Sequence, residues 1–497
     1  METASLEFEN CYRAISVRDA RFDGMFYTAV SSTGIYCRPV CPARTPSRVN
    51  CRFFVTAAAA ERAGFRPCLR CRPELAPGRP EFSQTMAWSI YSRLAEGALD
   101  RGSVEQLARE IGLSSRHMRR LLLDHFGVTP IEVAQTQRLL FAKKLLHETE
   151  LPMTEVALAS GFGSLRRFNA AFIESYRMSP SALRRESDED RRVSDVITLR
   201  LVYRPPLDWD YWLGYLAHRA IGGIESVSDG AYRRSVTMTH GSAVINGWFE
   251  VSNDESRHVL LLRAPRVLTP CLLPLTQRVR QLFDLNANPE LIAEQLSSSP
   301  LVGSLVKDGR RLRVPGAWDP FELSVRAVLG QQVSVRGAST LAARLAMRFC
   351  KPLPDGPADI DRLPIDASIL AARTPEEVAA IGVPRARAAT LVSLARLASS
   401  GGLIFPFGAT LSDMVARLKE VPGIGDWTAQ YIAMRALRQV DAFPSGDLGL
   451  RQAVSRLNGS SKPIVSSRDL ESLSDQWRPW RAYAASQLWS SLGEELA

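Results

Sequence analysis

The sequence lacks the long apolar segments on which membrane-spanning helices depend. Its longest hydrophobic stretches, such as residues 259–262, fall far short of the ~20 residues that cross a bilayer. The chain also opens without a basic stretch followed by an apolar one, the pattern of a secretory signal peptide. We therefore expect a cytoplasmic globular protein with no membrane partner, and 497 residues are enough for about three domains.

Cysteine is scarce, and half of it is concentrated near the N-terminus. Of the eight cysteines, four form a C-x3-C pair at Cys37 and Cys41 and a C-x2-C pair at Cys68 and Cys71. Two tight pairs of thiolates can close a tetrahedral site, so we predict one bound Zn2+. The scattered cysteines, expected to be small buried side chains, are Cys11, Cys51, Cys271 and Cys350.

The spacing of this quartet leaves its role open between a structural zinc and a reactive zinc thiolate. A structural site needs only four ligands, whereas zinc also keeps a bound sulfur deprotonated and nucleophilic at neutral pH. The quartet lies among arginines, and the chain carries a formal charge of +10 that is spread along its length. A basic surface is the electrostatic footprint of nucleic-acid binding, so we expect DNA as the partner.

Residues 84–186 are predicted to be helical and contain an approximate internal repeat. Residues 112–130 resemble residues 161–180, and each copy reads as a helix, a glycine-centred turn and a basic helix. This arrangement is the helix-turn-helix unit, present twice, with Ser103 and Thr154 as candidate caps of the first helix in each copy. By their spacing, the expected core residues are Leu107, Ile111, Leu121 and Phe126.

The remaining residues, 196–497, are predicted to form an α+β segment. Strand-like runs come first, and from residue 274 onward the pattern is almost entirely helical. Residues 73–80, rich in proline, and residues 186–195, rich in charge, are predicted linkers. The predicted strands are residues 196–203, 234–239, 243–251 and 258–262, with residues 26–30 and 52–55 near the N-terminus.

A glycine motif in the last third of the chain predicts a phosphate contact. Residues 421–425 read as a hairpin between two helices, in which Gly423 and Gly425 let the backbone approach a phosphate. Alone this is a weak signal, because many helix-helix turns carry it. Asp447 follows about twenty residues later; alone it reads as a helix N-cap, and with the hairpin it reads as a catalytic carboxylate.

The cysteine quartet and its neighbours resemble one family closely. Residues 33–41, TGIYCRPVC, and residues 63–71, AGFRPCLRC, are similar to the N-terminal domain of the Ada methyltransferases. The resemblance implies that Cys37, the first of the four ligands, irreversibly accepts a methyl group from a DNA phosphotriester. The methylated site would carry one negative charge fewer and bind DNA more tightly. Candidate phosphate contacts, which can also be solvated surface arginines, are Arg38, Arg44 and Arg70.

The repeated helix-turn-helix resembles the DNA-binding domain of AraC-type activators, which Ada proteins also carry. Two recognition helices can read two successive major grooves. Ada proteins often end in a second methyltransferase domain with a Pro-Cys-His-Arg motif; this chain has no Pro-Cys-His, so we expect no repair of O6-alkylguanine. Candidate DNA contacts, some of which can instead face solvent, are Ser115, Arg116, Arg119, Arg120, Ser164, Leu165, Arg166 and Arg167.

The C-terminal segment resembles the helix-hairpin-helix DNA glycosylases, and among them the AlkA-type 3-methyladenine glycosylases. Besides the hairpin, the resemblance rests on residues 204–209 (RPPLDW), 326–334 (RAVLGQQVS) and 477–484 (WRPWRAYA). It implies that Asp447 stabilises an oxocarbenium-like sugar during base loss. Trp427 stands where bifunctional members carry a lysine, which implies hydrolysis without strand cleavage.

The same resemblance implies how the base is recognised. An alkylated purine is cationic, and an aromatic pocket attracts it by stacking and cation–π interaction. The pocket positions are Trp427, Tyr431 and Trp489, although isolated aromatic residues are more often core. The base must be flipped out of the duplex, and the side chain that fills the gap is here Gln332, where a leucine is common in the family.

Together these features predict a multidomain α+β protein that joins a methylation sensor to a base-repair enzyme. We expect a small zinc-binding α/β domain (1–78), an all-α double helix-turn-helix domain (84–186), and a glycosylase with a β-sheet subdomain (196–285) and a helix-hairpin-helix core (286–497). The expected function is adaptive-response DNA repair, namely monofunctional removal of alkylated bases plus transcriptional activation after methyl transfer to Cys37. The expected partners are double-stranded DNA and RNA polymerase, and the expected state is a monomer.

Two other functions fit parts of the pattern. One is a transcription factor whose C-terminal domain only binds damaged DNA, and base release from methylated DNA separates it from a glycosylase. The other is a repair enzyme whose N-terminal half merely targets DNA. Methylation-dependent promoter binding distinguishes that enzyme from a sensor.

Overall fold

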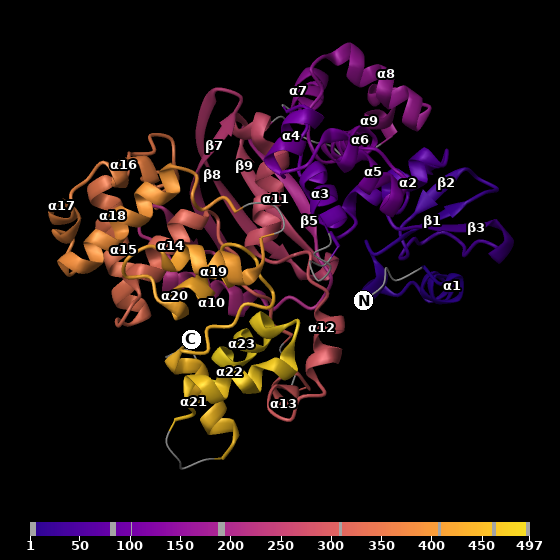
Figure 1. Cartoon of the computed structure of the whole chain (residues 1–497). Coiled ribbons are helices and arrows are strands. Elements are labelled where there is room, and N and C mark those ends of the chain that lie inside the picture. Colours follow the sequence, from indigo (N-terminus) through magenta and orange to yellow (C-terminus); the bar gives the residue numbers. More distant parts are fainter. Residues whose placement is uncertain are drawn as a thin grey trace. The chain divides into compact units, whose positions relative to one another are not determined.

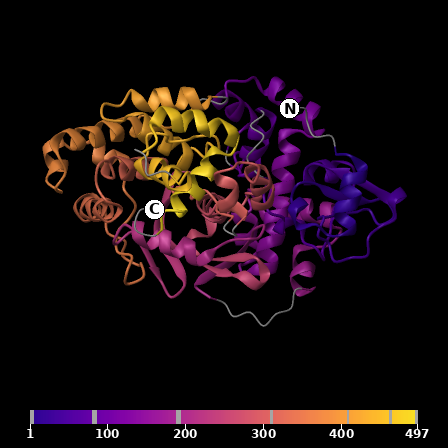
Figure 2. The ribbon, with the colours of Figure 1, turned by 90° about the horizontal axis from the view of Figure 1, so that it is seen from below.

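The structure is a computed structural model, and it describes residues 6–79, 86–100, 102–186, 194–307, 311–405, 409–459 and 464–493. The chain divides into two compact units, and each is described by itself (Figures 1 and 2). Unit 1 holds residues 1–204, 238–245 and 254–277, and unit 2 holds residues 205–237, 246–253 and 278–497. Most of the second predicted linker, residues 187–193, lies outside the described residues.

Unit 1 begins with a four-stranded sheet that brings the two cysteine pairs together. The strand order is β3-β1-β2-β4, in which β1 is antiparallel to both neighbours and β4 is parallel to β2. Because Tyr36 pairs with Pro67 in this parallel register, Cys37 at the end of β2 and Cys68 just after β4 are neighbours. Both predicted strands are confirmed within one residue; the elements are α1 (Phe8–Ser16), β1 (Tyr27–Val30), β2 (Ile35–Cys37), β3 (Cys51–Phe54), α2 (Ala57–Arg62) and β4 (Arg66–Pro67).

The helical part of unit 1 contains the predicted repeat. Ser103, Ser114 and Ser164 each accept a hydrogen bond from the backbone N–H three residues later, which fixes where their helices begin. The predicted cap at Thr154 is wrong, because α7 begins at Met153 and has a proline at its N-cap. The helices are α3 (Met86–Ala95), α4 (Val104–Glu110), α5 (Ser115–Phe126), α6 (Pro130–Glu148), α7 (Met153–Ala159), α8 (Leu165–Tyr176) and α9 (Pro180–Glu186).

The buried face of α5 passes through Leu122 and not through the predicted Leu121. Met118, Leu122 and Phe126 recur every fourth residue and are buried, whereas Leu121 is only half-buried. The prediction that Leu121 is a core residue is therefore wrong, since it lies about 100° around the helix from Leu122. The other predicted core residues of this region, Leu107, Ile111 and Phe126, are confirmed.

A five-stranded sheet follows, with the strand order β5-β9-β8-β7-β6. Burial alternates along β5, where Ile197, Leu199 and Leu201 are buried, as expected for a strand with one face on a core. All four predicted strands are present, and β6 was missed because it is short and polar. The elements are β5 (Val196–Val202), α10 (Trp209–Arg219), β6 (Glu225–Ser228), β7 (Ala231–His240), β8 (Ala243–Asp254) and β9 (Val259–Pro265).

Unit 2 is almost entirely helical after residue 278, as predicted. Residues 421–425 form a hairpin between α19 and α20, which pack against each other. The observed elements confirm the multidomain α+β class. The helices from residue 272 onward are α11 (Leu272–Leu282), α12 (Pro289–Leu296), α13 (Val302–Lys307), α14 (Pro320–Leu329), α15 (Val335–Phe349), α16 (Ala367–Ala371), α17 (Pro375–Ala379), α18 (Arg385–Ser399), α19 (Leu411–Lys419), α20 (Asp426–Arg435), α21 (Leu448–Leu457), α22 (Ser467–Ser474) and α23 (Arg481–Ser490).

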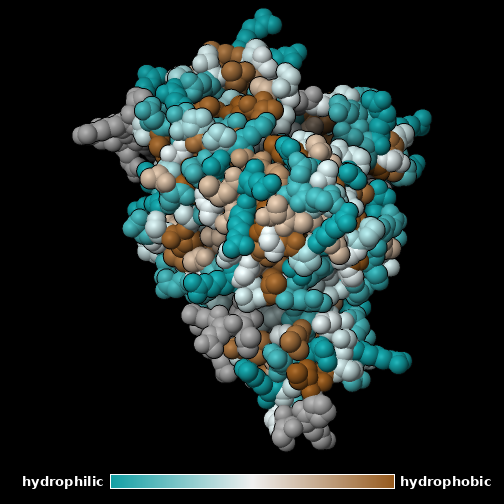
Figure 3. Space-filling model, turned by 90° about the vertical axis from the view of Figure 1, so that its left-hand side faces the viewer, coloured by the Kyte–Doolittle hydropathy of each residue, from teal (hydrophilic) through white to brown (hydrophobic). Residues whose placement is uncertain are grey.

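The surface carries hydrophilic and hydrophobic side chains side by side. On the face shown in Figure 3, hydrophilic areas are interrupted by separate smaller hydrophobic ones, as is usual for a globular protein. Among the described residues, no helix combines the length and the apolar character needed to cross a membrane.

Candidate functional sites

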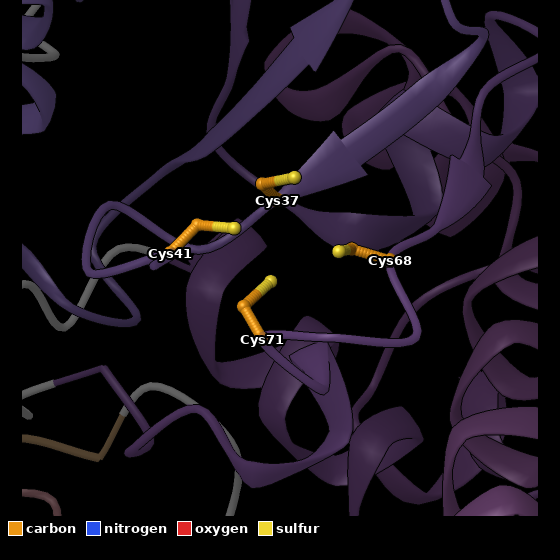
Figure 4. Close-up of side chains that lie close together, drawn as sticks. All are labelled: Cys37, Cys41, Cys68 and Cys71. Carbon is orange, nitrogen blue, oxygen red and sulfur yellow. The ribbon is translucent and has the colours of Figure 1, made fainter. Parts of the chain in front are cut away.

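The four quartet cysteines converge on one point in unit 1. Their sulfur atoms all lie within 4.8 Å of one another, and Figure 4 shows the four side chains pointing toward a common centre. A tetrahedral zinc with Zn–S bonds of about 2.3 Å requires sulfurs about 3.8 Å apart, so this donor set fits one zinc ion. The predicted ligands Cys37, Cys41, Cys68 and Cys71 are thus brought together by the fold.

The four sulfurs differ in exposure and in hydrogen bonding. Cys68 and Cys71 are 6% and 7% exposed, whereas Cys37 and Cys41 are half-buried. The backbone N–H of Arg38 donates to the Cys71 sulfur at 3.3 Å. Such a bond withdraws electron density from a thiolate, so it makes the Cys71 sulfur less nucleophilic.

The three arginines near the quartet are not equivalent. Arg44 and Arg70 are exposed, as a phosphate contact requires. Arg38 differs from its prediction, because it is 9% exposed and its guanidinium forms an ion pair with Asp23. Its Nη1 also donates to the Cys71 carbonyl at 3.2 Å. Arg38 therefore holds the cysteine loop in place and turns away from solvent.

Helix α6, which separates the two helix-turn-helix units, packs on the thiolate cluster. The Lys143 side chain is 0% exposed, and its Nζ donates to the Cys68 carbonyl at 3.0 Å and to Glu74 Oε2 at 2.8 Å. Glu61 accepts hydrogen bonds from the Tyr36 hydroxyl at 2.9 Å and from the Thr136 hydroxyl at 2.6 Å. Buried polar contacts therefore join the segment that carries the cysteines to α6 within unit 1.

Replacing Lys143 by Met should destabilise the protein by about 2–3 kcal/mol, since the buried Glu74 carboxylate loses one of its two cationic partners and keeps only Arg72. Urea unfolding of the full chain measures this change. Arg62→Met is the matched control, because the ion pair of Arg62 with Glu132 is exposed and should change stability by less than about 1 kcal/mol. Equal effects of the two substitutions would contradict the assignment of Lys143.

Glu61 should make the stability of unit 1 depend on pH. Burial raises the pKa of Glu61 from 4.5 to about 7, although its hydrogen bonds lower it. Between these values the folded protein holds a proton that the unfolded chain has released, so stability should fall as the pH rises through this window. Glu61→Gln should flatten this fall in urea unfolding, whereas Glu105→Gln, at an exposed position, should not.

The candidate recognition helices α5 and α8 present their basic residues to solvent. The N-terminal residue of α5, Ser115, is half-buried, and the side chains that follow on the outer face are exposed. In α8 the N-cap Ser164 and the next three residues are exposed. The predicted DNA contacts that are exposed are Arg116, Arg119, Arg120, Ser164, Leu165, Arg166 and Arg167.

In unit 2, both oxygens of Asp447 are held in place. Asp447 is the N-cap of α21, where its Oδ1 accepts a hydrogen bond from the Leu450 N–H at 3.0 Å. The indole N–H groups of Trp427 and Trp489 donate to Oδ2 at 2.8 Å and to Oδ1 at 2.9 Å. The capping interpretation is thus correct, and it is compatible with a catalytic one because the half-buried carboxylate also faces a cavity.

That cavity has a volume of about 1040 Å³ and is lined by Asp447 together with the predicted aromatic residues. The rings of Trp427 and Tyr431 are stacked, with centroids 5.7 Å apart and an interplanar angle of 14°. Trp489 lies edge-on to Tyr431 at 6.3 Å, and Arg435 donates a hydrogen bond to the Tyr431 hydroxyl at 2.7 Å. The cavity therefore offers aromatic rings against which a flat base can pack next to the carboxylate.

Replacing Trp489 by Phe tests whether the indole N–H matters. The substitution keeps an aromatic wall but removes one hydrogen bond to an ionised acceptor, a loss of about 1.5–3 kcal/mol. If the Asp447 carboxylate takes part in the expected base removal, the single-turnover rate of base release should fall about 10- to 100-fold. Trp209→Phe, which removes an indole bond to the Gly230 carbonyl, is the control and should leave the rate unchanged.

The hairpin next to the cavity is tightly constrained. Gly423 has a φ of +91°, and a Cβ there would lie 2.1 Å from the hydroxyl oxygen of Thr390, so only glycine fits. Gly423 and Gly425 are exposed, whereas Ile424 between them is buried. Gln332, at the predicted wedge position, is exposed and also has a left-handed φ of +57°.

Sequence reasoning missed several residues that hold these sites together. Lys143, Gln331, Thr390 and Arg435 each bind a partner far away in the sequence, in the case of Arg435 the Gly316 carbonyl. Of these residues, only Lys143 could have been noticed in the sequence, because it is a charged residue on the apolar side of a predicted helix.

Comparisons with known proteins match all three segments. The family model for the metal-binding domain of Ada matches residues 10–74, one for a helix-turn-helix domain matches residues 107–186, and one for the AlkA N-terminal domain matches residues 198–319. The 3-methyladenine DNA-glycosylase from Archaeoglobus fulgidus shares the fold, with a TM-score of 0.51 at 19% identity, covering 60% of this chain and 99% of that one.

Two relatives extend the match in sequence. DNA-3-methyladenine glycosylase 2 of Escherichia coli (strain K12) is 33% identical over 293 residues, which is 59% of this chain and 97% of that protein. The probable bifunctional transcriptional activator/DNA repair enzyme AlkA of Mycobacterium tuberculosis (strain H37Rv) is 39% identical over 492 residues, 98% of this chain and 97% of that protein. The chain therefore belongs to the AlkA family of bifunctional transcriptional activators and DNA repair enzymes, with an Ada-type zinc-binding domain at its N-terminus.

Proposed function

We propose that unit 2 removes alkylated purines such as 3-methyladenine from double-stranded DNA by hydrolysing the N-glycosidic bond. The observation that carries this proposal is the Asp447 carboxylate, fixed by two indole N–H groups at the edge of an aromatic cavity. The cavity has room for a flipped nucleotide. Its stacked rings favour a cationic base over a neutral one through cation–π attraction, about 0.5–2 kcal/mol per ring.

The reaction needs stabilisation of positive charge on the sugar. As the bond between the anomeric carbon and the base nitrogen breaks, the electron pair leaves with the base and the sugar becomes oxocarbenium-like. The fixed Asp447 carboxylate stabilises that charge without reorganising, and it can orient the attacking water. The tryptophan at position 427 offers no amine for a Schiff base, so the strand should stay intact.

We further propose that Cys37 is the methyl acceptor of unit 1. Its sulfur attacks the methyl carbon of a DNA methylphosphotriester, the carbon–oxygen bond breaks, and a phosphodiester anion leaves. Bound zinc would keep the attacking sulfur a thiolate at neutral pH. Cys37 is supported as the reactive member of the quartet by its place in the Ada-type motif and by its partial exposure, whereas Cys68 and Cys71 are buried and the Cys71 sulfur accepts an N–H bond.

The product would act as a switch. Cys41, Cys68 and Cys71 complete the site, and a methylated Cys37 would leave it with one negative charge fewer beside a basic surface. The exposed arginines of α5 and α8 are the proposed contacts to a promoter. We propose that the DNA-bound protein acts as a monomer in the cytoplasm and contacts RNA polymerase. Sedimentation of the promoter complex with and without polymerase tests the stoichiometry.

Incubation of the full chain with methylated duplex DNA tests both activities at once. Mass spectrometry identifies the released bases and locates any methyl group added to a cysteine. We expect free 3-methyladenine and a methyl group on the peptide that contains Cys37. A protein that binds the DNA but releases no base would contradict the glycosylase proposal.

A further inference from the structure

The loop between α14 and α15 carries two adjacent glutamines with opposite orientations. Gln332 is exposed, and its φ of +57° is unusual for a residue other than glycine. Its neighbours Val333 and Ser334 are exposed as well. Gln331, in contrast, turns its side chain inward to the hairpin that precedes α20.

The amide of Gln331 connects this loop to the hairpin. Its Nε2 donates to the Gly423 carbonyl at 3.0 Å and to the Thr428 hydroxyl at 3.1 Å. The Gln331 carbonyl in turn accepts a hydrogen bond from Arg387 Nη2 at 2.6 Å. The loop is therefore held through both the side chain and the backbone of the residue that precedes Gln332.

Helix α18 holds the hairpin from the other side. Thr390, one turn after Arg387, donates its hydroxyl to the Pro422 carbonyl at 2.9 Å and lies against Gly423. Arg387 and Thr390 are three residues apart, so they share one face of the helix. One rigid helix thus holds both the loop that carries Gln332 and the hairpin that carries Gly423 and Gly425.

We propose that Gln331 is a positioning residue that fixes the Gln332 loop relative to the phosphate-binding hairpin, so that backbone capture and base extrusion are coupled. This inference rests on the proposed glycosylase function and on the expectation from the sequence that the hairpin binds a DNA phosphate and that Gln332 enters the duplex. Without the Gln331 amide the hairpin still binds the backbone, but the loop must find its position during extrusion. Only a paired base has to be extruded against stacking and pairing.

The test compares duplex and single-stranded substrates of the same sequence. Gln331→Glu keeps the shape of the side chain but removes the N–H donor, and Gln331→Ala removes the whole amide. For both variants in the full chain, we expect release of 3-methyladenine from duplex DNA to fall about 10- to 100-fold, as two lost hydrogen bonds imply. Release from single strands should change by less than about threefold. Loss of folding would lower release from both substrates alike, so it would not produce this difference between duplex and single-stranded DNA.

Two further measurements sharpen the result. The fluorescence of 2-aminopurine, placed opposite an alkylated-base analogue in the duplex, should rise on binding of the intact protein and rise less with Gln331→Glu. Arg387→Ala should show the same duplex-specific loss, because it frees the backbone of the same loop. Gln476→Glu is the matched control, since the amide of Gln476 donates to the Leu473 carbonyl outside the cavity.

Equal losses on duplex and single-stranded DNA would overturn the proposal, and so would unchanged duplex activity in Gln331→Ala. If the intact protein released no base from either substrate, the proposed glycosylase function itself would fail. The two failures are therefore distinguishable.

Discussion

Replacing Asp447 by Asn should lower the rate of base release by at least about 100- to 1000-fold, the usual cost of removing one preorganised electrostatic group. The carboxylate lines the cavity, and a neutral amide in its place cannot offset a developing oxocarbenium ion. The amide would also place an N–H group against one of the two indole donors, which disturbs the geometry further. Single-turnover release of 3-methyladenine from a methylated duplex measures the loss.

The substitution should leave folding and DNA binding intact. Asn caps a helix about as well as Asp, so α21 keeps its N-terminus. Asp366→Asn is the matched control, because Asp366 caps α16 by accepting from the Ser368 N–H at 2.7 Å and lies outside the cavity lining. Equal activity of Asp447→Asn and Asp366→Asn would remove Asp447 from the mechanism.

Replacing Cys37 by Ala should abolish methyl transfer and the tighter promoter binding that follows it. In the intact protein, methylation removes one unit of negative charge from the site. A unit charge 4 Å from a phosphate is worth about 1 kcal/mol in water and more at a protein surface, so affinity should rise at least about fivefold. The gain should shrink as salt is added. Promoter binding before and after exposure to methylated DNA measures it.

A buried cysteine of the same domain provides the control. Cys51→Ala removes a thiol that lies outside the thiolate cluster, so it should keep both methyl transfer and the rise in affinity. If Cys37→Ala still showed methylation-dependent binding, the sensor would be another residue.

The sequence predicts the cysteine quartet because the metal chemistry and the short spacing are local properties. It does not predict the fate of Arg38, since the partner Asp23 becomes adjacent only when the sheet forms. The error at Leu121 is one of helical phase, which a few residues of pattern do not define.

At the cavity, the resemblance predicts which aromatic residues form the pocket, but it does not predict that two of them hydrogen-bond the Asp447 carboxylate. Trp427 and Trp489 lie 20 and 42 residues from Asp447, and their hydrogen bonds to its carboxylate depend on how α20, α21 and α23 pack. The contact of Gln331 with Gly423 spans 92 residues. Such long-range polar contacts leave no periodic signal, because any exposed glutamine has the same sequence pattern.

We propose that one chain carries two separate chemistries, a reusable carboxylate and a sacrificial thiolate. The most direct test treats methylated duplex DNA with the intact protein, Asp447→Asn and Cys37→Ala in parallel, and measures released 3-methyladenine and methylated cysteine in each. We expect both products from the intact protein, only methylated Cys37 from Asp447→Asn, and only free base from Cys37→Ala. Base release by Asp447→Asn at the rate of the intact protein, or methylated cysteine in Cys37→Ala, would contradict this proposal.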